Sequence, residues 1–426
     1  MKIRSATLGI PLAWPPEAAM VERAGRGLAG AMARFGAAGW TVQTTRLALP
    51  PFPAVLGWRE PERVPALARW LGAHCAAAEI GYASLGPVLA DAPADAAASP
   101  AAFAATIPTA LAQTETVFAA VALDGADGVR AEMALAAAAV IVQVARTSPD
   151  GFGNLRFAAL ARCPAGIPFL PAAYHDGGPP SLALALEAAD LAQAAFADAP
   201  SVDAAQARLT AAVEDVGGRL AAVVEGICVE QGWRFGGLDL SLAPFPDLPN
   251  SIAAALERLG LECFGAFGTL YAARCVTEAL RRARLPRCGF SGLMLPLLED
   301  RALADAAAAG RLSVNDLLLY SAVCGTGLDT IPLPGDVSEG ELAALLLDVA
   351  TLAVALDKPL TARLLPIPGQ AAGQLTAFDF PFFANTRILP TRGIVPTALL
   401  RRAVSSPPPT PSLLVGEGEY QEPGES

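Results

Sequence analysis

The segment IRSATLGIPL at residues 3–12 is an apolar run that predicts a β-strand, and EAAMVERAGRGLAGAMARF at residues 17–35 follows it with a helical pattern. The next run, WTVQTTRL at residues 40–47, again predicts a strand. A strand, a helix and a second strand in direct succession form the repeating unit of α/β proteins. This opening unit therefore predicts an α/β fold.

The alternation continues in two series of strand-like runs. The first continues at residues 80–89, 117–123, 156–163 and 167–174, and the second comprises residues 235–243, 263–270, 289–297, 329–333 and 361–367. Helical patterns lie between many of them, at residues 62–78, 181–197, 202–231 and 338–356. Because the strands are almost continuously apolar, we expect both faces of the sheet to be buried.

We expect a single domain over residues 1–403, with halves at about residues 1–200 and 232–390 that the helical segment 202–231 joins. Residues 404–426, rich in Pro, Gly and Glu, cannot build a core, so they predict a disordered tail.

Composition and charge exclude several classes of protein. Of the 426 residues, 53% are hydrophobic and 17% charged, which excludes disorder for most of the chain. The net charge of −11 argues against nucleic acid or an anionic membrane as the main partner. Seven scattered cysteines are too few for a disulfide scaffold, so they predict a reducing, cytoplasmic location.

No segment predicts a membrane-spanning helix. The apolar runs at residues 133–145 and 342–356 are flanked or interrupted by charges and fall short of the roughly 18 uninterrupted residues that a span needs. Lys2 and Arg4 precede an apolar stretch, as in a signal peptide, but prolines follow and no small-residue cleavage site does. We therefore expect an opening strand there.

Residues 25–30, GRGLAG, match the pattern G-x-G-x-x-G, and Arg46 lies in the next strand, as in a dinucleotide site. In such sites the glycines follow a strand directly and open the helix, so that its amides face the phosphates. Here they fall inside the helical pattern of residues 17–35, which favours close helix packing instead.

The strand at residues 234–244, RFGGLDLSLAP, alternates with period two. Leu238, Leu240 and Leu242 share one face, whereas Asp239 and Ser241 share the other. A carboxylate and a hydroxyl on an inward face predict a site in which Asp239 orients or protonates a substrate and Ser241 binds it. The alternative is a structural aspartate whose oxygens are satisfied by hydrogen bonds near the strand end.

The segment VCGTGLDTIPLPGD at residues 323–336 predicts a tight glycine loop whose exposed amides could bind an anion or stabilise an oxyanion. Cys324 is a candidate nucleophile, and the alternative is a small thiol packed in the core. Asp329 is a candidate to orient or protonate the substrate, and Asp336 is a candidate to bind it.

His175 follows the apolar run at residues 167–174, at a strand end where sites of α/β proteins gather. The only other histidine, His74, lies within a helical pattern. His175 is therefore the candidate general base, because imidazole titrates near neutral pH. The alternative is that it braces a loop.

Asn154, Arg156 and Arg363 are candidates for substrate binding. An arginine in an apolar strand needs a partner, either an anionic ligand or a protein carboxylate such as Asp329, and the ion pair remains the alternative. No spacing of His, Cys, Asp and Glu indicates a metal site, and no motif indicates a cofactor.

Several of these segments, in order along the chain, resemble the family named domain of unknown function 711, whose members are often labelled pyruvate formate-lyase-like proteins. The resemblance rests on residues 154–159, 168–175, 237–244, 323–336 and 361–369 and runs from the N-terminus to about residue 390. It implies the barrel of the glycyl-radical enzymes, a ten-stranded α/β barrel of two five-stranded halves.

The resemblance does not imply radical chemistry. Residues 391–394, TRGI, depart from the Arg-Val-x-Gly-aromatic type of segment that carries a glycyl radical, and Cys324 stands alone where the lyase has a cysteine pair. The family's name states no activity.

Together these features predict a cytoplasmic, non-radical enzyme that acts on a small polar or anionic metabolite inside the barrel, without nucleic-acid or membrane partners. A metabolite-binding or regulatory protein without catalysis is the first alternative, and a structural or assembly protein is the second. The reaction class, the cofactor and the formation of a homo-oligomer stay open.

Overall fold

The computed structural model describes residues 1–393 and residue 400, and the tail predicted at residues 404–426 lies outside the described residues. The described residues form a mixed α/β structure around one large sheet of nine strands. In spatial order the sheet consists of β10 (Gly327–Pro334), β11 (Leu360–Ile367), β7 (Phe157–Ala161), β4 (Val117–Ala122), β3 (Tyr82–Val88), β2 (Val42–Ala48), β1 (Lys2–Gly9), β8 (Ser181–Glu187) and β9 (Arg234–Ala243). The α/β class predicted from the opening unit is confirmed.

The strands form three blocks: five central strands run in one direction, and a pair at each edge runs in the opposite direction. β1, β2, β3, β4 and β7 are parallel to one another, as are β8 and β9, and β10 and β11. The two antiparallel joins are those of β1 with β8 and of β11 with β7. The direction changes along the chain between β7 and β8, ahead of the helix that we expected to join two halves. The division of the chain into halves stays a prediction.

The segment at residues 286–297 lies between the two edge strands of this sheet. It forms an isolated parallel bridge to β9 at Leu238↔Arg287 and another to β10 at Pro296↔Asp329. It is not a regular strand, since prolines lack the ladder donor and Ser291 has a φ of 40°. The described strands therefore do not confirm the closed, ten-stranded barrel that the sequence predicts.

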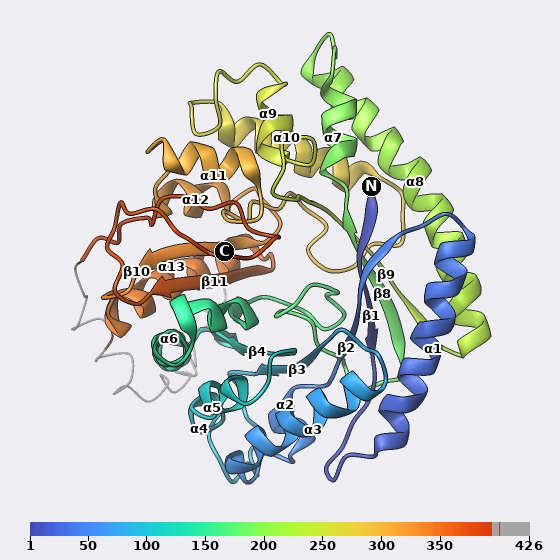
Figure 1. Cartoon of the computed structure of the whole chain (residues 1–426), viewed down its shortest axis with the longest axis vertical. Helices are drawn as coiled ribbons and strands as arrows, with labels where there is room; N and C mark the ends of the chain where they lie inside the picture. Colours follow the sequence, from blue (N-terminus) through green and yellow to red (C-terminus); the bar gives the residue numbers. More distant parts are fainter. Residues whose placement is uncertain (394–399, 401–426) are drawn as a thin grey trace, which may run out of the picture.

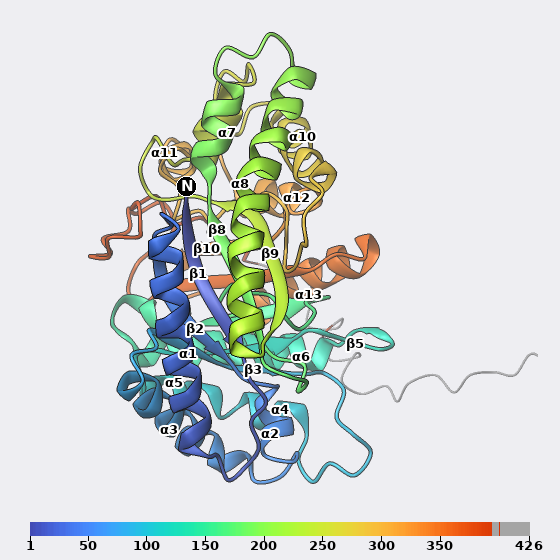
Figure 2. The same ribbon diagram turned by 90° about the vertical axis from the view of Figure 1, so that its right-hand side faces the viewer.

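Helices cover the outer face of the curved sheet, so the strands lie nearer the centre in Figure 1. The longer ones are α1 (Ala18–Ala37), α3 (Val64–Ala77), α6 (Ala131–Thr147), α8 (Val202–Gln231), α10 (Thr269–Arg282) and α13 (Glu339–Leu356). The shorter ones are α2 (Phe52–Val55), α4 (Pro100–Ala104), α5 (Ile107–Ala112), α7 (Ala189–Phe196), α9 (Ile252–Glu257), α11 (Arg301–Ala308) and α12 (Val314–Tyr320). Figure 2 shows α1 and α8 side by side, where Arg34 pairs with Glu230. Across the described residues, no helix has both the length and the apolar character for crossing a membrane.

The glycines of the G-x-G-x-x-G match lie inside α1, and two of them, Gly25 and Gly27, serve close packing, whereas Gly30 is exposed. A Cβ added to Gly25 would come within 2.6 Å of the Ala78 carbonyl oxygen, and one on Gly27 would overlap the Trp233 ring. Helix α1 therefore approaches its neighbours closely at these positions.

The two faces of the sheet use residues of different size. The outer face and the helices share one large core that contains Leu8, Leu47 and Leu184. Smaller inner clusters contain the alanines Ala48, Ala120, Ala158, Ala185 and Ala243. Small side chains leave room inside the curve of the sheet, and phenylalanines from loops, such as Phe169 and Phe290, enter it.

Besides the run at residues 289–297, three predicted elements are wrong. Residues 181–187 form strand β8 rather than the start of a helix, since leucines alternate with alanines there and the two kinds of side chain fall on opposite faces. Residues 167–174 form a loop that crosses the inside of the sheet, and residues 263–270 form turns that lead into α10. Short apolar runs do not distinguish a strand from a buried loop.

Candidate functional site

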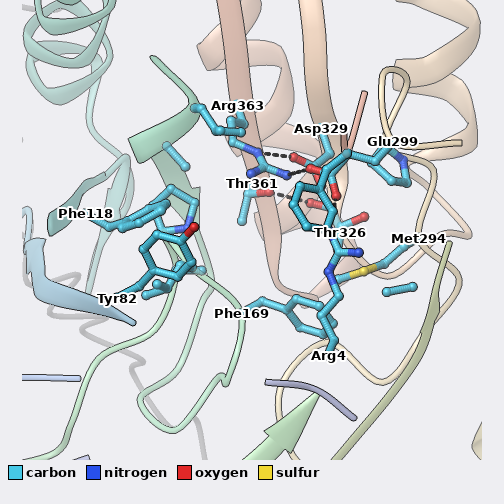
Figure 3. Close-up of a pocket in the computed structure, with 18 of the residues that line it drawn as sticks. Arg4, Tyr82, Phe118, Phe169, Met294, Glu299, Thr326, Asp329, Thr361 and Arg363 are labelled. Atoms are coloured by element: carbon cyan, nitrogen blue, oxygen red, sulfur yellow. Dashed lines mark hydrogen bonds and ion pairs between the residues drawn. The ribbon is translucent and has the colours of Figure 1, made fainter. Parts of the chain in front are cut away.

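A cavity lies inside the curve of the sheet, and side chains from all strands of the large sheet except β8, together with the inner loops, line it. The cavity has a volume of about 120 Å³, which is room for several waters or a small ligand. Figure 3 shows a charged group on one side of this cavity and aromatic side chains on another.

The charged group is a row of buried side chains with alternating sign. Arg4 on β1 donates to Glu299 Oε2 at 2.5 Å, and Arg363 on β11 donates to Glu299 Oε1 at 2.7 Å. The other end of the Arg363 guanidinium donates from Nε to Asp329 Oδ1 on β10 at 2.6 Å. Glu299 therefore joins β1, the first strand of the chain, to β11, the last.

The row extends outward on the other side of Arg4. Glu187 on β8 accepts from Arg4 Nη1 at 3.3 Å and lies 3.7 Å from the ammonium group of Lys2, which is half exposed. The row consists of three cations and three carboxylates: Lys2, Glu187, Arg4, Glu299, Arg363 and Asp329. These charges neutralise one another.

Irregularities in the strands accompany these charges. The register of β1 against β8 shifts between Ile3 and Ser5, on either side of Arg4, and that of β10 against β11 shifts between Leu328 and Ile331, around Asp329. Thr330 has a φ of 49°, a strained value for a β-branched residue. Bulges re-aim side chains and are frequent beside functional sites, which is consistent with charged groups turned inward here.

The two carboxylates of Glu299 and Asp329 differ in their surroundings. Burial opposes ionisation of Glu299, but the guanidinium groups of Arg363 and Arg4 outweigh it and lower its pKa. Burial raises the pKa of Asp329, and Arg363 only partly offsets it. Both oxygens of Glu299 accept hydrogen bonds, whereas Asp329 Oδ2 accepts none from the described residues. Asp329 is thus the carboxylate better suited to take up a proton.

Arg46 on β2 is the cation of the cavity that has no carboxylate within 4 Å among the described residues. Its Nε donates to Thr44 Oγ1 at 3.1 Å, and its two terminal nitrogens have no hydrogen-bond partner in the described part of the chain. Burial, together with the positive charge of Arg4, lowers the pKa of Arg46 to about 9, so the guanidinium stays charged at neutral pH. It can therefore receive an anion.

The remaining wall is apolar and largely aromatic. Tyr82 and Phe118 meet edge to face with ring centres 5.5 Å apart, and Phe169 and Phe290 lie 6.4 Å apart. Thr326 also borders the cavity, and its buried hydroxyl has no partner among the described residues. The wall suits an apolar ligand body.

Of the residues that the sequence singles out, the structure places Asp329 and Arg363 at this cavity, in direct contact with each other. Arg363 pairs with the protein carboxylates of Asp329 and Glu299, so the ion pair given as the alternative to ligand binding is present. The other predicted site residues lie elsewhere.

Asp239 and Ser241 are buried outside the cavity and hydrogen-bonded to each other. Asp239 also accepts from the backbone amides of Phe290 and Ser291, at 2.8 and 3.0 Å. These contacts use both carboxylate oxygens to tie β9 to the segment at residues 286–297. These contacts favour the structural alternative, and a catalytic role of Asp239 stays a prediction.

Cys324 does not line the cavity and is 1% exposed. Its sulfur accepts from the Gly327 amide at 3.3 Å, and its carbonyl accepts from the ammonium group of Lys358. Lys358 also donates to the Ser321 carbonyl at 2.9 Å, so it binds carbonyls just past the end of α12. The thiol lies packed in the core, the alternative given for it.

His175 is buried in a loop beside the end of β1, away from the cavity. Its Nδ1 accepts from the Gly177 amide at 3.2 Å, so Nε2 carries the hydrogen and donates to the Pro179 carbonyl at 3.2 Å. Burial lowers its pKa. The imidazole braces the loop, the alternative given for it, and its role as a general base stays a prediction.

The three further candidates for substrate binding also lie outside the cavity. Asn154 donates to the Ile141 carbonyl at 3.0 Å, and Arg156 donates to the Thr114 carbonyl at 2.5 Å. Asp336 is exposed, on a separate surface depression. Each was chosen for its place in a strand or loop, and the fold turns it toward other backbone groups or toward solvent.

The residues that the sequence predictions missed are Arg4, Arg46 and Glu299. Arg4 and Arg46 each lie in a strand-like run, so the signal that identified Arg363 applies to both of them. Glu299 follows the segment at residues 286–297 and does not lie within an apolar strand, so the sequence gives no comparable signal for it. No group of three or more potential metal ligands occurs within residues 1–393.

The chain is similar to proteins whose names state no activity. The family described as Uncharacterised ACR (DUF711) matches residues 1–383. A UPF0210 protein of Desulforudis audaxviator is 29% identical over 435 residues, which covers 97% of this chain and 96% of the relative. A UPF0210 protein of Pyrobaculum aerophilum is 37% identical over 233 residues, 51% of this chain, and there the match spans about half (50%) of the relative's length.

Proposed function

The chain belongs to the family described as Uncharacterised ACR (DUF711), and from that premise we propose that it binds a small anionic metabolite in the central cavity and acts on it as a non-radical enzyme. The observation that carries the proposal is Arg46, a cavity guanidinium without a carboxylate partner among the described residues. Arg46 is only partly exposed. A partly buried cation gains from an opposite charge, and a guanidinium suits carboxylate or phosphate groups.

The chemical part of the proposal rests on Asp329. Its Oδ2 faces no donor among the described residues, and its raised pKa favours holding a proton once it has accepted one. Two neighbouring carboxylates whose pKa values are shifted in opposite directions are typical of acid–base sites. In this proposal Asp329 removes a proton from the bound ligand, while Arg363 holds the carboxylate in place.

A second candidate function is a metabolite-binding or regulatory protein without catalysis. It is favoured by the positions of His175, Cys324 and Asp239, because three of the four groups expected to perform chemistry lie outside the cavity. Arg46 would bind the ligand equally in both cases, so the two functions differ only in whether the ligand changes.

Two further proposals concern the fold and location. The segment at residues 286–297 would take the place of a tenth strand and close the sheet into a barrel, supported by its bridges to both edge strands. The family likeness to pyruvate formate-lyase-like proteins is part of that proposal, but glycyl-radical chemistry is not.

All seven cysteines are free thiols, which supports a cytoplasmic location. Assembly into a homo-oligomer stays a prediction.

The test is incubation of the purified chain with a metabolite extract, followed by mass spectrometry of bound and free compounds. Wild-type protein should retain an anionic compound, and Arg46→Met should lose it, whereas exposed Arg69→Met is the control that should keep it. Asp329→Asn should retain the compound but no longer convert it. An unchanged compound with wild-type protein would favour the binding function, and retention independent of Arg46 would overturn the proposal.

A further inference from the structure

We propose that the cavity takes a monoanion with a flat, apolar body, such as an aromatic monocarboxylate. This inference rests on the proposed function and adds the class of ligand. Its basis is the balance of charge around the cavity together with the chemistry of the opposite wall.

The charge balance leaves one positive charge. Within the row, the cations Lys2, Arg4 and Arg363 are balanced by the carboxylates of Glu187, Glu299 and Asp329. Arg46 lies outside this row and adds a single uncompensated cation. One ligand carboxylate would neutralise it.

A second negative charge on the ligand would be unfavourable. Glu299 and Asp329 both border the cavity, and no other cation there lacks a carboxylate partner among the described residues. Unpaired like charges in a buried site discriminate strongly against the wrong ligand. The same pair of carboxylates therefore selects against dianions.

The free donors of Arg46 fit a carboxylate. Because Nε is occupied by Thr44 Oγ1, the two terminal nitrogens remain for the ligand, and they form a planar pair of donors. Two parallel hydrogen bonds to one carboxylate fix the orientation of the ligand as well as its charge.

The body of the ligand would lie against the aromatic wall. Tyr82 and Phe118 come from β3 and β4, and β3 is the neighbour of the strand that carries Arg46. Figure 3 places these two rings across the cavity from Asp329 and Glu299. Aromatic surfaces contribute most when a flat apolar group covers them, and the small volume suits a single ring.

Isothermal titration calorimetry at pH 7.5 with four small probes tests the inference. Benzoate carries both required features. Benzamide lacks the negative charge, and acetate lacks the ring. Phenyl phosphate has the ring but is almost entirely a dianion at this pH. We expect benzoate to bind at least tenfold more tightly than each of the other three, and Arg46→Met to weaken benzoate binding at least tenfold. Arg69→Met is the matched control and should bind as the wild type does.

The outcomes separate this inference from the proposed function. If phenyl phosphate binds as tightly as benzoate and still depends on Arg46, the restriction to monoanions is overturned while the anion site stands. If acetate binds as tightly as benzoate, the apolar body is overturned. If no anion binds in a manner that depends on Arg46, the inference and the proposed function both fall.

Discussion

At the scale of single residues, Arg363 bonds two buried carboxylates at once. Its side chain is 11% exposed, and those of Glu299 and Asp329 are 10% and 12% exposed. Buried ion pairs add little to stability when complete, but removal of one partner leaves charges without compensation. Loss of Arg363 should therefore disturb the charge balance of the row more than loss of any other side chain in it.

We expect Arg363→Met to lower the free energy of unfolding by about 3–5 kcal/mol, since it leaves Asp329 without a cation and Glu299 with one. Urea denaturation at pH 7 measures this change. Arg274→Met is the control, because Arg274 forms an exposed pair with Glu278 four residues along α10, and its loss should cost about 0.5 kcal/mol or less. A loss below about 1 kcal/mol for Arg363→Met would contradict the role of the row.

The pairing of Arg363 with Asp329 could be anticipated from sequence, because a charge inside an apolar strand demands a partner. Arg46 has the same local pattern, yet its lack of a carboxylate depends on which strands become neighbours. The roles of Asp239 and His175 could not be read from local sequence either. The backbone amides that satisfy Asp239 come from a segment about 50 residues away.

At the scale of elements, the helices end where the backbone can turn. Helix α8 stops at Gly232, which has a φ of 67° and accommodates the left-handed conformation that other residues adopt only with strain. Gly218 lies within the same helix, and open space surrounds the position of an added Cβ there.

These two glycines predict opposite effects of the same substitution. Gly232→Ala should lower the free energy of unfolding by about 1–2 kcal/mol, because alanine is strained at positive φ. Gly218→Ala should raise it by about 0.5–1 kcal/mol, because alanine favours a helix interior. Urea denaturation of both variants checks this, and equal effects of the same sign would contradict the assignment of the helix end.

Most long elements could be predicted from their periodicity, but β8 could not. Its sequence SLALALE is rich in residues that favour helices, and only the alternation of leucine with alanine marks it as a strand. Tertiary packing decided the outcome, since the inner face of the sheet needs small side chains and the outer face needs large ones.

At the scale of the whole molecule, Asp239 connects the segment at residues 286–297 to the edge of the sheet. Burial raises the pKa of this carboxyl to about 6, even though hydrogen bonds from Ser241 and from the Phe290 and Ser291 amides oppose the shift. An unfolded chain has a pKa of about 3.9 at such a group. The folded state therefore binds this proton more tightly than the unfolded state does.

The contribution of Asp239 to stability is accordingly full below about pH 4 and is lost as the pH rises through about 6. Between pH 4 and pH 8 we expect the free energy of unfolding of the wild type to fall by roughly 2–3 kcal/mol relative to that of Asp239→Asn. Urea denaturation of both proteins across this pH range gives the difference between their free energies of unfolding. The contributions of other titrating groups are common to both proteins and cancel in this difference. A difference that stays constant or grows with pH would refute the assigned pKa.

The class of the fold follows from the sequence, whereas the order of its strands does not. Alternating strands and helices predict an α/β protein, and the large sheet agrees. The two antiparallel joins bring together strands that are distant along the chain, so no local pattern reports them. The segment at residues 286–297 illustrates the same difficulty, since its contacts rather than its backbone geometry relate it to the sheet.

The pairing of β7 with β11 has a consequence for synthesis on the ribosome. β7 ends at Ala161, and its partner Leu360 emerges roughly 200 residues later. At about 5–20 residues per second, translation takes on the order of 10–40 s to supply it. During that interval the nascent chain presents an unpaired apolar strand edge, which attracts other chains. This edge of β7 is therefore open to intermolecular pairing until β11 has been synthesised.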